Sequence, residues 1–398
     1  MDITIKPGKL SGTLSAIPSK SQAHRMLICA AFADKPTKLH CKSVNQDIEA
    51  TANCLRALGA TINRTEYGYH IIPVSNLPDS AVLNCNESGS TLRFMLPIAG
   101  ALGVDTVFQM SGRLPSRPLS PLWEEMERMG CLLSRPTSDT LRLKGKLKAG
   151  IYTIDGGVSS QFITGLLFAT ALINGRTELN VTGKVESKPY IDMTLKALHT
   201  FGVETDGYSV RDNQRFQTPG QCVIEGDWSN AAFFLAANAL GSDLEITGLD
   251  LDSPQGDRVC RDILQNLSAT AEIDAADVPD LVPILAVTAG ALNGAKFRNI
   301  ARLRLKESDR VATVTDMLSK LGCAVFAEEN ALQVFPGKYQ GCVIDASGDH
   351  RIAMSAAIAA TVAGGPVTIL GAECVAKSYP TFWEEYKRLG GNYEQHIW

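Results

Sequence analysis

The sequence has little that would tie it to a membrane, a metal or nucleic acid. No stretch approaches about 18 uninterrupted apolar residues, and the opening MDITIKPGKL has no hydrophobic signal core, so neither a membrane span nor a secretory leader is expected. The ten cysteines form no CxxC pair and show no histidine spacing typical of zinc. The net charge of −4 gives no general attraction to nucleic acid or anionic lipid. These absences favour a cytoplasmic protein without metal, membrane or nucleic-acid contacts.

A repeat of two helix patterns is the strongest feature that the sequence does contain. Each copy pairs an apolar helix rich in small residues with an amphipathic helix that closes at a glycine in five of six cases, as a left-handed cap favours. The closing positions are separated by 71, 72, 66, 54 and 68 residues. This recurrence predicts one supersecondary unit copied six times. The closing positions are Gly59, Gly130, Gly202, Ser268, Gly322 and Gly390.

The two helix types predict which elements are buried. The apolar helices have no polar face and should lie inside a domain, with amphipathic helices next and strands outside. A chain of 398 residues is too long for one core, so two domains of three units each are expected. In the first unit the order is β-α-β-α-β-β, with Asp47 as a candidate N-cap. The apolar helices are predicted at His24–Asp34, Ser90–Gly103, Ser160–Asn174, Asn230–Gly241, Leu281–Gly294 and His350–Gly365.

Serines and cations gather at the starts of these helices. Helix N-termini carry unpaired amide donors and partial positive charge, so they attract phosphates and carboxylates. We expect these ends to face a cleft between the domains lined by about eight cations, although the protein is acidic overall. The groups are Lys20-Ser21 with Arg25, Ser88-Gly89-Ser90 with Arg93, Arg117, Ser159-Ser160-Gln161, Ser187-Lys188, Lys306-Glu307 with Arg310, Asp349-His350-Arg351, and Lys377-Ser378.

Ten short strings, in order along almost the whole chain, resemble the enolpyruvyl transferase family. The resemblance implies an α/β fold, an inside-out α/β barrel with two domains of three βαβαββ units each, helices buried and sheets outside. It places the domains at 1–18 plus 227–398 and at 19–226. The strings are PSKSQAHR, ESGSTLRF, PSRPL, VSSQF, ESKPYIDMT, IEGD, VPDL, RLKESDR, GDHRIAM and AKSYPTF.

The resemblance implies transfer of the enolpyruvyl group of phosphoenolpyruvate to the 5-hydroxyl of shikimate 3-phosphate, with release of phosphate. Both substrates are anions, so several fixed cations must offset their repulsion. The chemistry needs an acid for the methylene carbon and a base for the hydroxyl, through a tetrahedral intermediate. No cofactor or metal is implied, and a monomer is expected. Binding of shikimate 3-phosphate should favour domain closure.

Site roles follow from matching positions. Lys20, Asp280 and Glu307 resemble the proton-transfer residues of the family. The residues that resemble the family's phosphoenolpyruvate-binding residues are Lys20, Gly89, Arg117, Gln161, Arg310, Arg351 and Lys377. Those that resemble its shikimate 3-phosphate-binding residues are Ser21, Arg25, Ser159, Ser160, Gln161, Ser187, Tyr190, Asp280 and Lys306.

Other interpretations of single residues stay open. Asp280 taken alone is most simply a helix cap, Glu307 a surface ion pair, Tyr190 ordinary core packing, and His24 and His350 neutral hydrogen-bonding residues.

One position departs from the pattern. Glu87 stands where many relatives carry Asn, and we expect it to pair with Arg93 or Arg117, because an unpaired carboxylate would repel phosphoenolpyruvate.

Two other functions compete with this assignment. One is the related transfer to UDP-N-acetylglucosamine, for which the family normally shows Asn at the Ser21 position and a Cys in the loop near Arg113–Pro118. The other is a non-catalytic metabolite-binding protein on the same scaffold, which should have lost the carboxylates or cations retained here.

Overall fold

The computed structural model describes residues 1–211, 214–267 and 271–396, so the predicted closing residue Ser268 lies outside the described residues. The chain divides into two compact units. The N-terminal unit consists of Met1–Ile17 with Glu225–Trp398, and the inserted unit of Pro18–Ile224. The sequence-based boundaries, 1–18 plus 227–398 and 19–226, lie within two residues of this division. Each unit is described by itself below.

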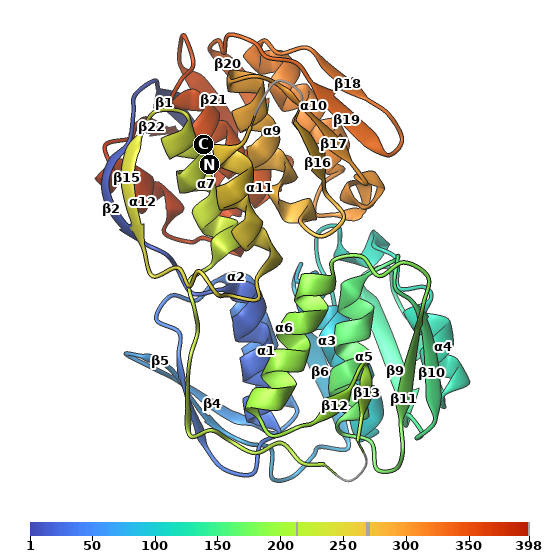
Figure 1. Cartoon of the computed structure of the whole chain (residues 1–398). Helices are drawn as coiled ribbons and strands as arrows, with labels where there is room; N and C mark the ends of the chain where they lie inside the picture. Colours follow the sequence, from blue (N-terminus) through green and yellow to red (C-terminus); the bar gives the residue numbers. More distant parts are fainter. Residues whose placement is uncertain (212–213, 268–270, 397–398) are drawn as a thin grey trace. The chain divides into compact units, whose positions relative to one another are not determined.

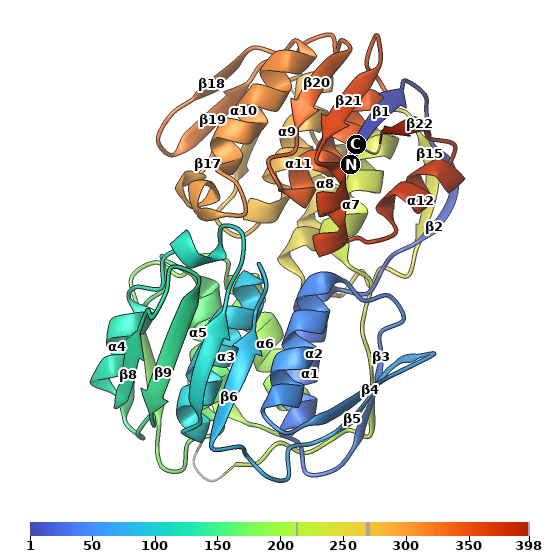
Figure 2. The same ribbon diagram turned by 180° about the vertical axis from the view of Figure 1, so that it is seen from behind.

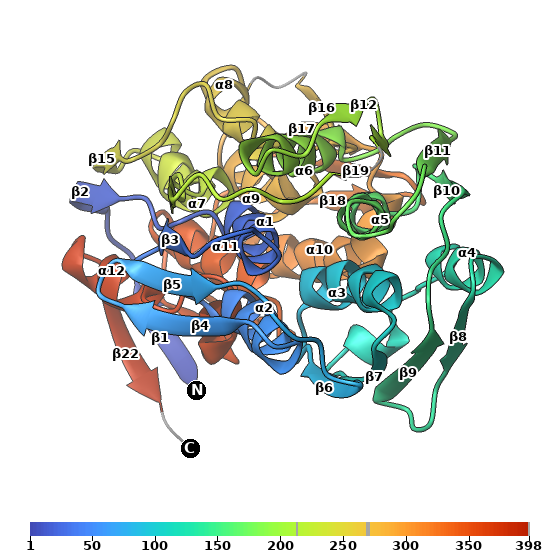
Figure 3. The same cartoon turned by 90° about the horizontal axis from the view of Figure 1, so that it is seen from below.

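Helices form the interior of the inserted unit (Figure 3). The interior helices are α1 (Lys20–Ala31), α2 (Gln46–Ala57), α3 (Gly89–Leu102), α5 (Ser160–Thr170) and α6 (Lys188–Thr200). The short helix α4 (Leu122–Arg128) lies at the periphery against β8 (Cys131–Ser134) and β10 (Ile151–Asp155), and the 3-10 turn η1 (Leu114–Ser116) precedes it in the chain (Figure 3). Helices α1, α2, α3, α5 and α6 form a ring in which each contacts the next and α6 contacts α1. Almost every residue of α3 and α5 is buried. This burial confirms the prediction drawn from their missing polar face.

Sheets cover the ring of the inserted unit. Its strands are β3 (Thr37–His40), β4 (Thr61–Thr65), β5 (Gly68–Ile72), β6 (Ser80–Asn84), β7 (Asp105–Gln109), β8 (Cys131–Ser134), β9 (Thr140–Gly145), β10 (Ile151–Asp155), β11 (Glu178–Thr182), β12 (Thr205–Asp206), β13 (Ser209–Val210) and β14 (Gln221–Val223). The sheet orders are β14-β3-β5-β4, β6-β7-β9-β8, β10-β11 and β12-β13. Both four-stranded sheets begin with a parallel pair and continue antiparallel. The two four-stranded sheets therefore come from copies of the same repeat unit.

The N-terminal unit is also built around helices (Figure 2). They are α7 (Trp228–Ala239), α8 (Cys260–Gln265), α9 (Val282–Ala291), α10 (Arg310–Leu321), α11 (His350–Ala360) and α12 (Phe382–Arg388), with 3-10 turns η2 (Gly256–Val259), η3 (Pro279–Leu281), η4 (Ala301–Leu305) and η5 (Ala372–Lys377). Helices α7, α9 and α11 contact one another. The core of the unit forms where these three buried helices meet.

The sheets of the N-terminal unit join the two ends of the chain (Figure 1). Its strands are β1 (Asp2–Lys6), β2 (Ser11–Ser15), β15 (Asp243–Thr247), β16 (Glu272–Asp274), β17 (Ala295–Arg298), β18 (Val325–Ala327), β19 (Ala331–Val334), β20 (Cys342–Asp345), β21 (Val367–Leu370) and β22 (Asn392–His396). Two sheets, β20-β21-β1-β22 and β16-β17-β19-β18, repeat the parallel-then-antiparallel pattern. The third consists of the parallel pair β15-β2. Strands β1 and β2 thus complete sheets made by residues beyond 242.

Helix ends follow the sequence with one correction. The five predicted closing glycines all have a positive φ, from 73° to 113°, so each adopts the left-handed conformation that glycine favours. Asp47 is not the N-cap of α2. Asn45 is the cap, with its Oδ1 accepting from Ile48 N at 3.0 Å, and Asp47 pairs with Lys20 instead. Within the described ranges, no helix combines the length and apolar character that a membrane crossing requires.

Candidate active site

Three buried helices of the inserted unit begin with a serine cap. Ser19, Ser88 and Ser159 accept a hydrogen bond on Oγ from a backbone amide two or three residues further on, at 3.4, 3.2 and 3.3 Å. Ser159 therefore acts as a helix cap, while its predicted contact with substrate stays a prediction. The caps fix the starts of α1, α3 and α5, where further amide donors and the positive helix end remain.

Two arginines converge on the start of α3. A Cβ added at Gly89 would lie 2.7 Å from the NH1 atoms of both Arg93 and Arg117, so the absence of a side chain leaves room for both guanidinium groups. Arg93 is buried and donates to Gln161 Oε1 at 3.2 Å and to a backbone carbonyl. Gln161 Nε2 donates to Ser90 Oγ at 3.0 Å and joins the start of α5 to that of α3. The structure thus brings three predicted residues, Gly89, Arg117 and Gln161, into one cationic group.

Lys20, the first residue of α1, is held by an ion pair. Its Nζ lies 2.9 Å from Asp47 Oδ2, and each side chain is 18% exposed. The pair joins the start of α1 to the start of α2.

Arg25 donates hydrogen bonds to the backbone of two other predicted site residues. Its guanidinium donates to Ser21 O at 2.6 Å, Tyr190 O at 2.8 Å and Thr194 Oγ1 at 2.9 Å. Burial lowers the pKa of Arg25 to about 10, yet the group stays protonated at neutral pH. Arg25 therefore ties α1 to α6 and positions Ser21 and Tyr190.

Two further serines of the predicted set are buried at helix starts. Ser160 is the first residue of α5 and Ser187 directly precedes α6. Ser187 has φ +55°, a left-handed conformation that is uncommon for a residue with a side chain. Strained backbone of this kind often occurs at ligand-binding positions.

Arg310 is the centre of a second cluster, in the N-terminal unit. It is 1% exposed, and its nitrogens contact three carboxylates. NH1 lies 2.7 Å from Asp280 Oδ1, NH2 lies 2.7 Å from Glu307 Oε2, and Nε lies 2.8 Å from Asp349 Oδ2. Because a buried guanidinium is costly without such partners, this network fixes the geometry of all four side chains.

Asp280 is surrounded by cations. Besides Arg310, Arg351 NH2 lies 3.3 Å from its Oδ2 and Lys306 Nζ lies 3.4 Å from its Oδ1. Burial favours the protonated acid, but the charges of Arg351, Lys306 and Arg310 outweigh it and hold the pKa of Asp280 well below its usual range. The side chain is 22% exposed and makes no capping bond, so the helix-cap interpretation is wrong. Asp280 is an ionised carboxylate that stays accessible.

The lysine beside Asp280 differs from a surface lysine. Burial lowers the pKa of Lys306, with a further contribution from the charge of Arg310, although Asp280 and Glu307 act in the opposite direction. Glu307 belongs to the cluster and is 24% exposed, so it is more than a surface ion pair.

Ser229 and Asp257 of this cluster were missed as site candidates, and Asp349 was named only as part of a helix start, without a role. Asp349 caps α11 and accepts from Arg310 and Ser308, and its place before a buried helix was the available signal. Ser229 accepts from Arg351 NH2 at 2.7 Å. Burial and the charge of Asp280 raise the pKa of Asp257 to about 6. Ser229 and Asp257 both lie in the fourth repeat of the chain.

The remaining candidates are more isolated. Lys377 ends η5 and donates to Gly348 O at 2.8 Å. His24 is buried and shares a 2.8 Å hydrogen bond with Thr51. Burial, with the charges of Lys20 and Arg25, holds its pKa well below the usual range, so it is the neutral residue that was predicted. Glu87 packs against Gly112, and its predicted pairing with Arg93 or Arg117 stays a prediction.

Solved structures of other proteins have the same fold of helix-centred units. The EPSP synthase of Acinetobacter baumannii superposes with a TM-score of 0.80 at 24% identity, over 99% of this chain and 100% of that one. The enolpyruvyl transferase NikO from Streptomyces tendae gives 0.76 at 19% identity, over 99% and 98%. At these identities the likeness establishes the fold, as predicted from the sequence.

Sequence relatives make the family specific. The family model described as EPSP synthase (3-phosphoshikimate 1-carboxyvinyltransferase) matches residues 5–386. Proteins named 3-phosphoshikimate 1-carboxyvinyltransferase are 39% identical in Clostridium kluyveri, over 99% of this chain and 98% of the relative, and 36% identical in Clostridium acetobutylicum, over 100% and 98%. The chain belongs to the EPSP synthase family, and the resemblance found in the sequence is confirmed.

Proposed function

We propose that this protein transfers the enolpyruvyl group of phosphoenolpyruvate to the 5-hydroxyl of shikimate 3-phosphate and releases phosphate. Membership of the EPSP synthase family over residues 5–386 supports the reaction. The observation that carries the proposal is Asp280, an accessible carboxylate kept ionised by three cations. Such a group is ionised at neutral pH and can accept the hydroxyl proton, and its low pKa makes it a weak base until bound anions share the charge of its three cations.

The acid–base roles are proposed for the N-terminal unit and Lys20. Asp280 takes the proton of the 5-hydroxyl of shikimate 3-phosphate while the oxygen of that hydroxyl bonds to C2 of phosphoenolpyruvate. At the same time an acid, Glu307 or Lys20, protonates the methylene carbon. The tetrahedral intermediate then loses phosphate as the methyl carbon returns a proton. Arg310 contacts both carboxylates, so it couples their protonation: neutralising one leaves more of its charge for the other.

Cations and helix ends are proposed to hold the anionic groups. Lys20, Gly89, Arg117 and Gln161 suit phosphoenolpyruvate, because the glycine gives space beside two guanidinium groups at a helix N-terminus. For the same substrate we propose Arg310, Arg351 and Lys377. For shikimate 3-phosphate we propose Ser21, Arg25, Ser159, Ser160, Gln161, Ser187, Tyr190, Asp280 and Lys306.

A turnover assay tests the reaction and its acceptor. Phosphate release is measured with phosphoenolpyruvate and shikimate 3-phosphate, and separately with phosphoenolpyruvate and UDP-N-acetylglucosamine. We expect release with the first pair alone. Release of phosphate with UDP-N-acetylglucosamine would instead assign the protein the related transferase activity. No release with either pair would favour a non-catalytic binding protein.

A further inference from the structure

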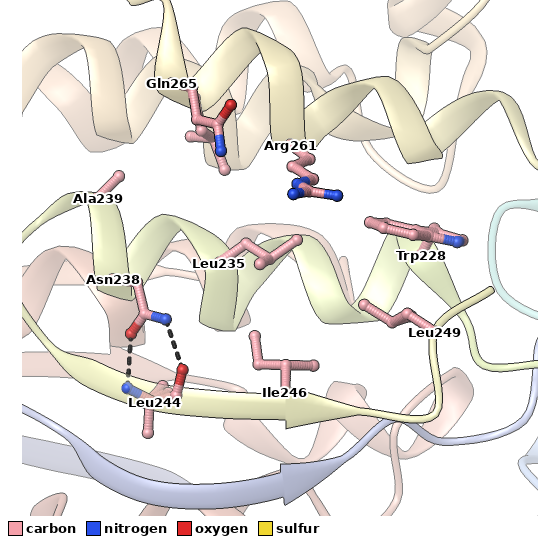
Figure 4. A pocket seen from close by; sticks show the side chains of 10 residues that line it. Trp228, Leu235, Asn238, Ala239, Leu244, Ile246, Leu249, Arg261 and Gln265 are labelled. Atoms are coloured by element: carbon pink, nitrogen blue, oxygen red, sulfur yellow. Dashed lines mark hydrogen bonds between the residues drawn. The ribbon is translucent and has the colours of Figure 1, made fainter. Parts of the chain in front are cut away.

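A cavity of about 440 Å³ lies in the N-terminal unit between α7, α8 and β15 (Figure 4). Arg261 and Gln265 reach it from α8, and Trp228 lies at its end at the start of α7. The volume is in the range of small-molecule sites. The lining residues are Trp228, Leu235, Asn238, Ala239, Leu244, Ile246, Leu249, Arg261, Leu264 and Gln265.

The cavity forms in the fourth repeat of the chain, which is shorter than the other repeats. In the four-stranded sheets, the strand after the buried helix also pairs with an antiparallel neighbour, but within the described residues β15 pairs with β2 alone. The helix closings on either side of the missing strands are only 54 residues apart. The alignment with the Clostridium kluyveri relative extends over 420 positions, more than the 398 residues of this chain, so that relative has segments absent here.

Apolar side chains that a complete sheet would cover remain half-buried. Leu235, Ile246, Leu249 and Leu264 pack at the edge of the core and line the cavity. Asn238 closes part of the open strand edge, because its amide exchanges two hydrogen bonds with the backbone of Leu244, at 2.8 and 2.9 Å. The walls are therefore apolar, and the amide of Asn238 is already engaged.

The remaining polar groups of the lining limit what the cavity can bind. The guanidinium of Arg261 is exposed to solvent, makes no hydrogen bond or ion pair with any residue in the described part of the chain, and is the one charged group of the lining. Trp228 is 1% exposed and its indole N–H donates to Asp250 O at 2.9 Å, so this side chain closes one end of the cavity (Figure 4). One cation suits one negative charge, whereas a phosphorylated dicarboxylate or similar polyanion would keep uncompensated charge against leucine side chains.

We propose that this cavity is a second ligand site, which binds a small monocarboxylate with an aromatic or branched apolar body. The carboxylate pairs with Arg261, and the body contacts Leu235, Ile246 and Leu264. The substrates of the proposed reaction each carry a phosphate and a carboxylate, so this site selects a different chemical class. The proposal does not depend on the roles given to Asp280 or Arg310.

Calorimetric titration of the full-length protein with phenylacetate tests the site, with neutral phenylacetamide as the matched ligand. Arg261→Gln removes the cation, and Leu235→Trp fills the cavity. Arg298→Gln is the control, because that exposed arginine pairs with Glu272 and does not line the cavity. Thermal melting of each variant establishes that it is folded.

We expect phenylacetate to bind in the millimolar range or better, and phenylacetamide at least about tenfold more weakly. Arg261→Gln should weaken phenylacetate by at least about tenfold, Leu235→Trp should abolish binding, and Arg298→Gln should change nothing. The titration is repeated with saturating shikimate 3-phosphate and phosphoenolpyruvate, where binding should persist. No binding to the wild-type protein, equal binding by folded Arg261→Gln, or full competition by the substrates would overturn the proposal.

Discussion

The two candidate clusters use charge in different ways. In the inserted unit, serines cap the buried helices, Arg93 and Arg25 donate hydrogen bonds to neutral oxygens, and Lys20 pairs with Asp47. In the N-terminal unit, Arg310 alone contacts three carboxylates. In the second cluster three cations, Arg310, Arg351 and Lys306, lie with three carboxylates, Asp280, Glu307 and Asp349, whereas the hydrogen bonds given above for Arg25 and Arg93 are with neutral groups.

This difference separates holding anions from moving protons. An anion is bound by cations and helix ends whose charge is not already neutralised. A proton-transfer carboxylate needs the opposite, a set of partners that fix its pKa and orientation. We therefore expect substitutions of Gly89, Arg117 and Ser160 to act mainly on substrate affinity, and those of Asp280 and Glu307 mainly on kcat.

Arg310→Gln should give the largest loss of stability. It leaves three carboxylates without their shared cation, and breaking a buried ion pair costs about 3–5 kcal/mol. Urea unfolding measures the loss. Arg304→Gln is the matched control, because its half-exposed pair with Asp309 at 3.6 Å should contribute less than about 1 kcal/mol. Similar losses in the two variants would show that the cluster does not organise the unit.

Asp257→Asn should stabilise the protein, and more at high pH than at low pH. The pKa of Asp257 is about 6 in the folded state, above the ordinary value of 3.8, so the folded protein binds the proton more tightly. Stability is therefore lost as pH rises from about 4 to about 6, by about 3 kcal/mol in total. Asparagine cannot ionise and removes this loss. Unfolding at pH 4.5 and pH 8 tests it, and an equal effect at both values contradicts the raised pKa.

Gly89→Ala should raise the KM for phosphoenolpyruvate about tenfold, equivalent to about 1.4 kcal/mol, with little change in stability. The added Cβ would stand 2.7 Å from two guanidinium groups, which must move away, while alanine is a good helix former. Gly8→Ala is the control, since a Cβ there meets nothing within 4 Å. An unchanged KM would show that phosphoenolpyruvate does not bind at the start of α3.

Glu87→Gln should have the smallest effect. If its carboxylate pairs with Arg93 or Arg117 and stiffens the loop, the variant loses less than about 1 kcal/mol of stability and its KM for phosphoenolpyruvate does not fall. Steady-state kinetics and thermal melting check both. A lower KM with unchanged stability would mean that Glu87 acts by repelling the substrate.

The fold could be predicted because its determinants are local. Apolar helices without a polar face, closing glycines and alternating strands recur in the sequence, and each has one structural consequence. The N-cap of α2 was predicted incorrectly, because Asn45 and Asp47 are both good capping residues and only the ion pair with Lys20 separates their roles.

The site could be predicted only in part. Asp280, Glu307, Lys306 and Arg310 gather in the structure, but their proximity follows from packing and not from spacing in the chain. Asp257 and Ser229 were missed for the same reason. Their charge environment depends on Asp280 and Arg351, which lie far away in the sequence.

The most direct test compares Asp280→Asn with Ser160→Ala, measuring kcat by phosphate release and the Kd of shikimate 3-phosphate by calorimetry. We predict that Asp280→Asn lowers kcat by about 10²–10⁴-fold with less than about tenfold change in Kd. Ser160→Ala should weaken Kd by about tenfold and leave kcat within about threefold. If Asp280→Asn keeps its kcat and loses only affinity, the division between holding anions and moving protons is wrong.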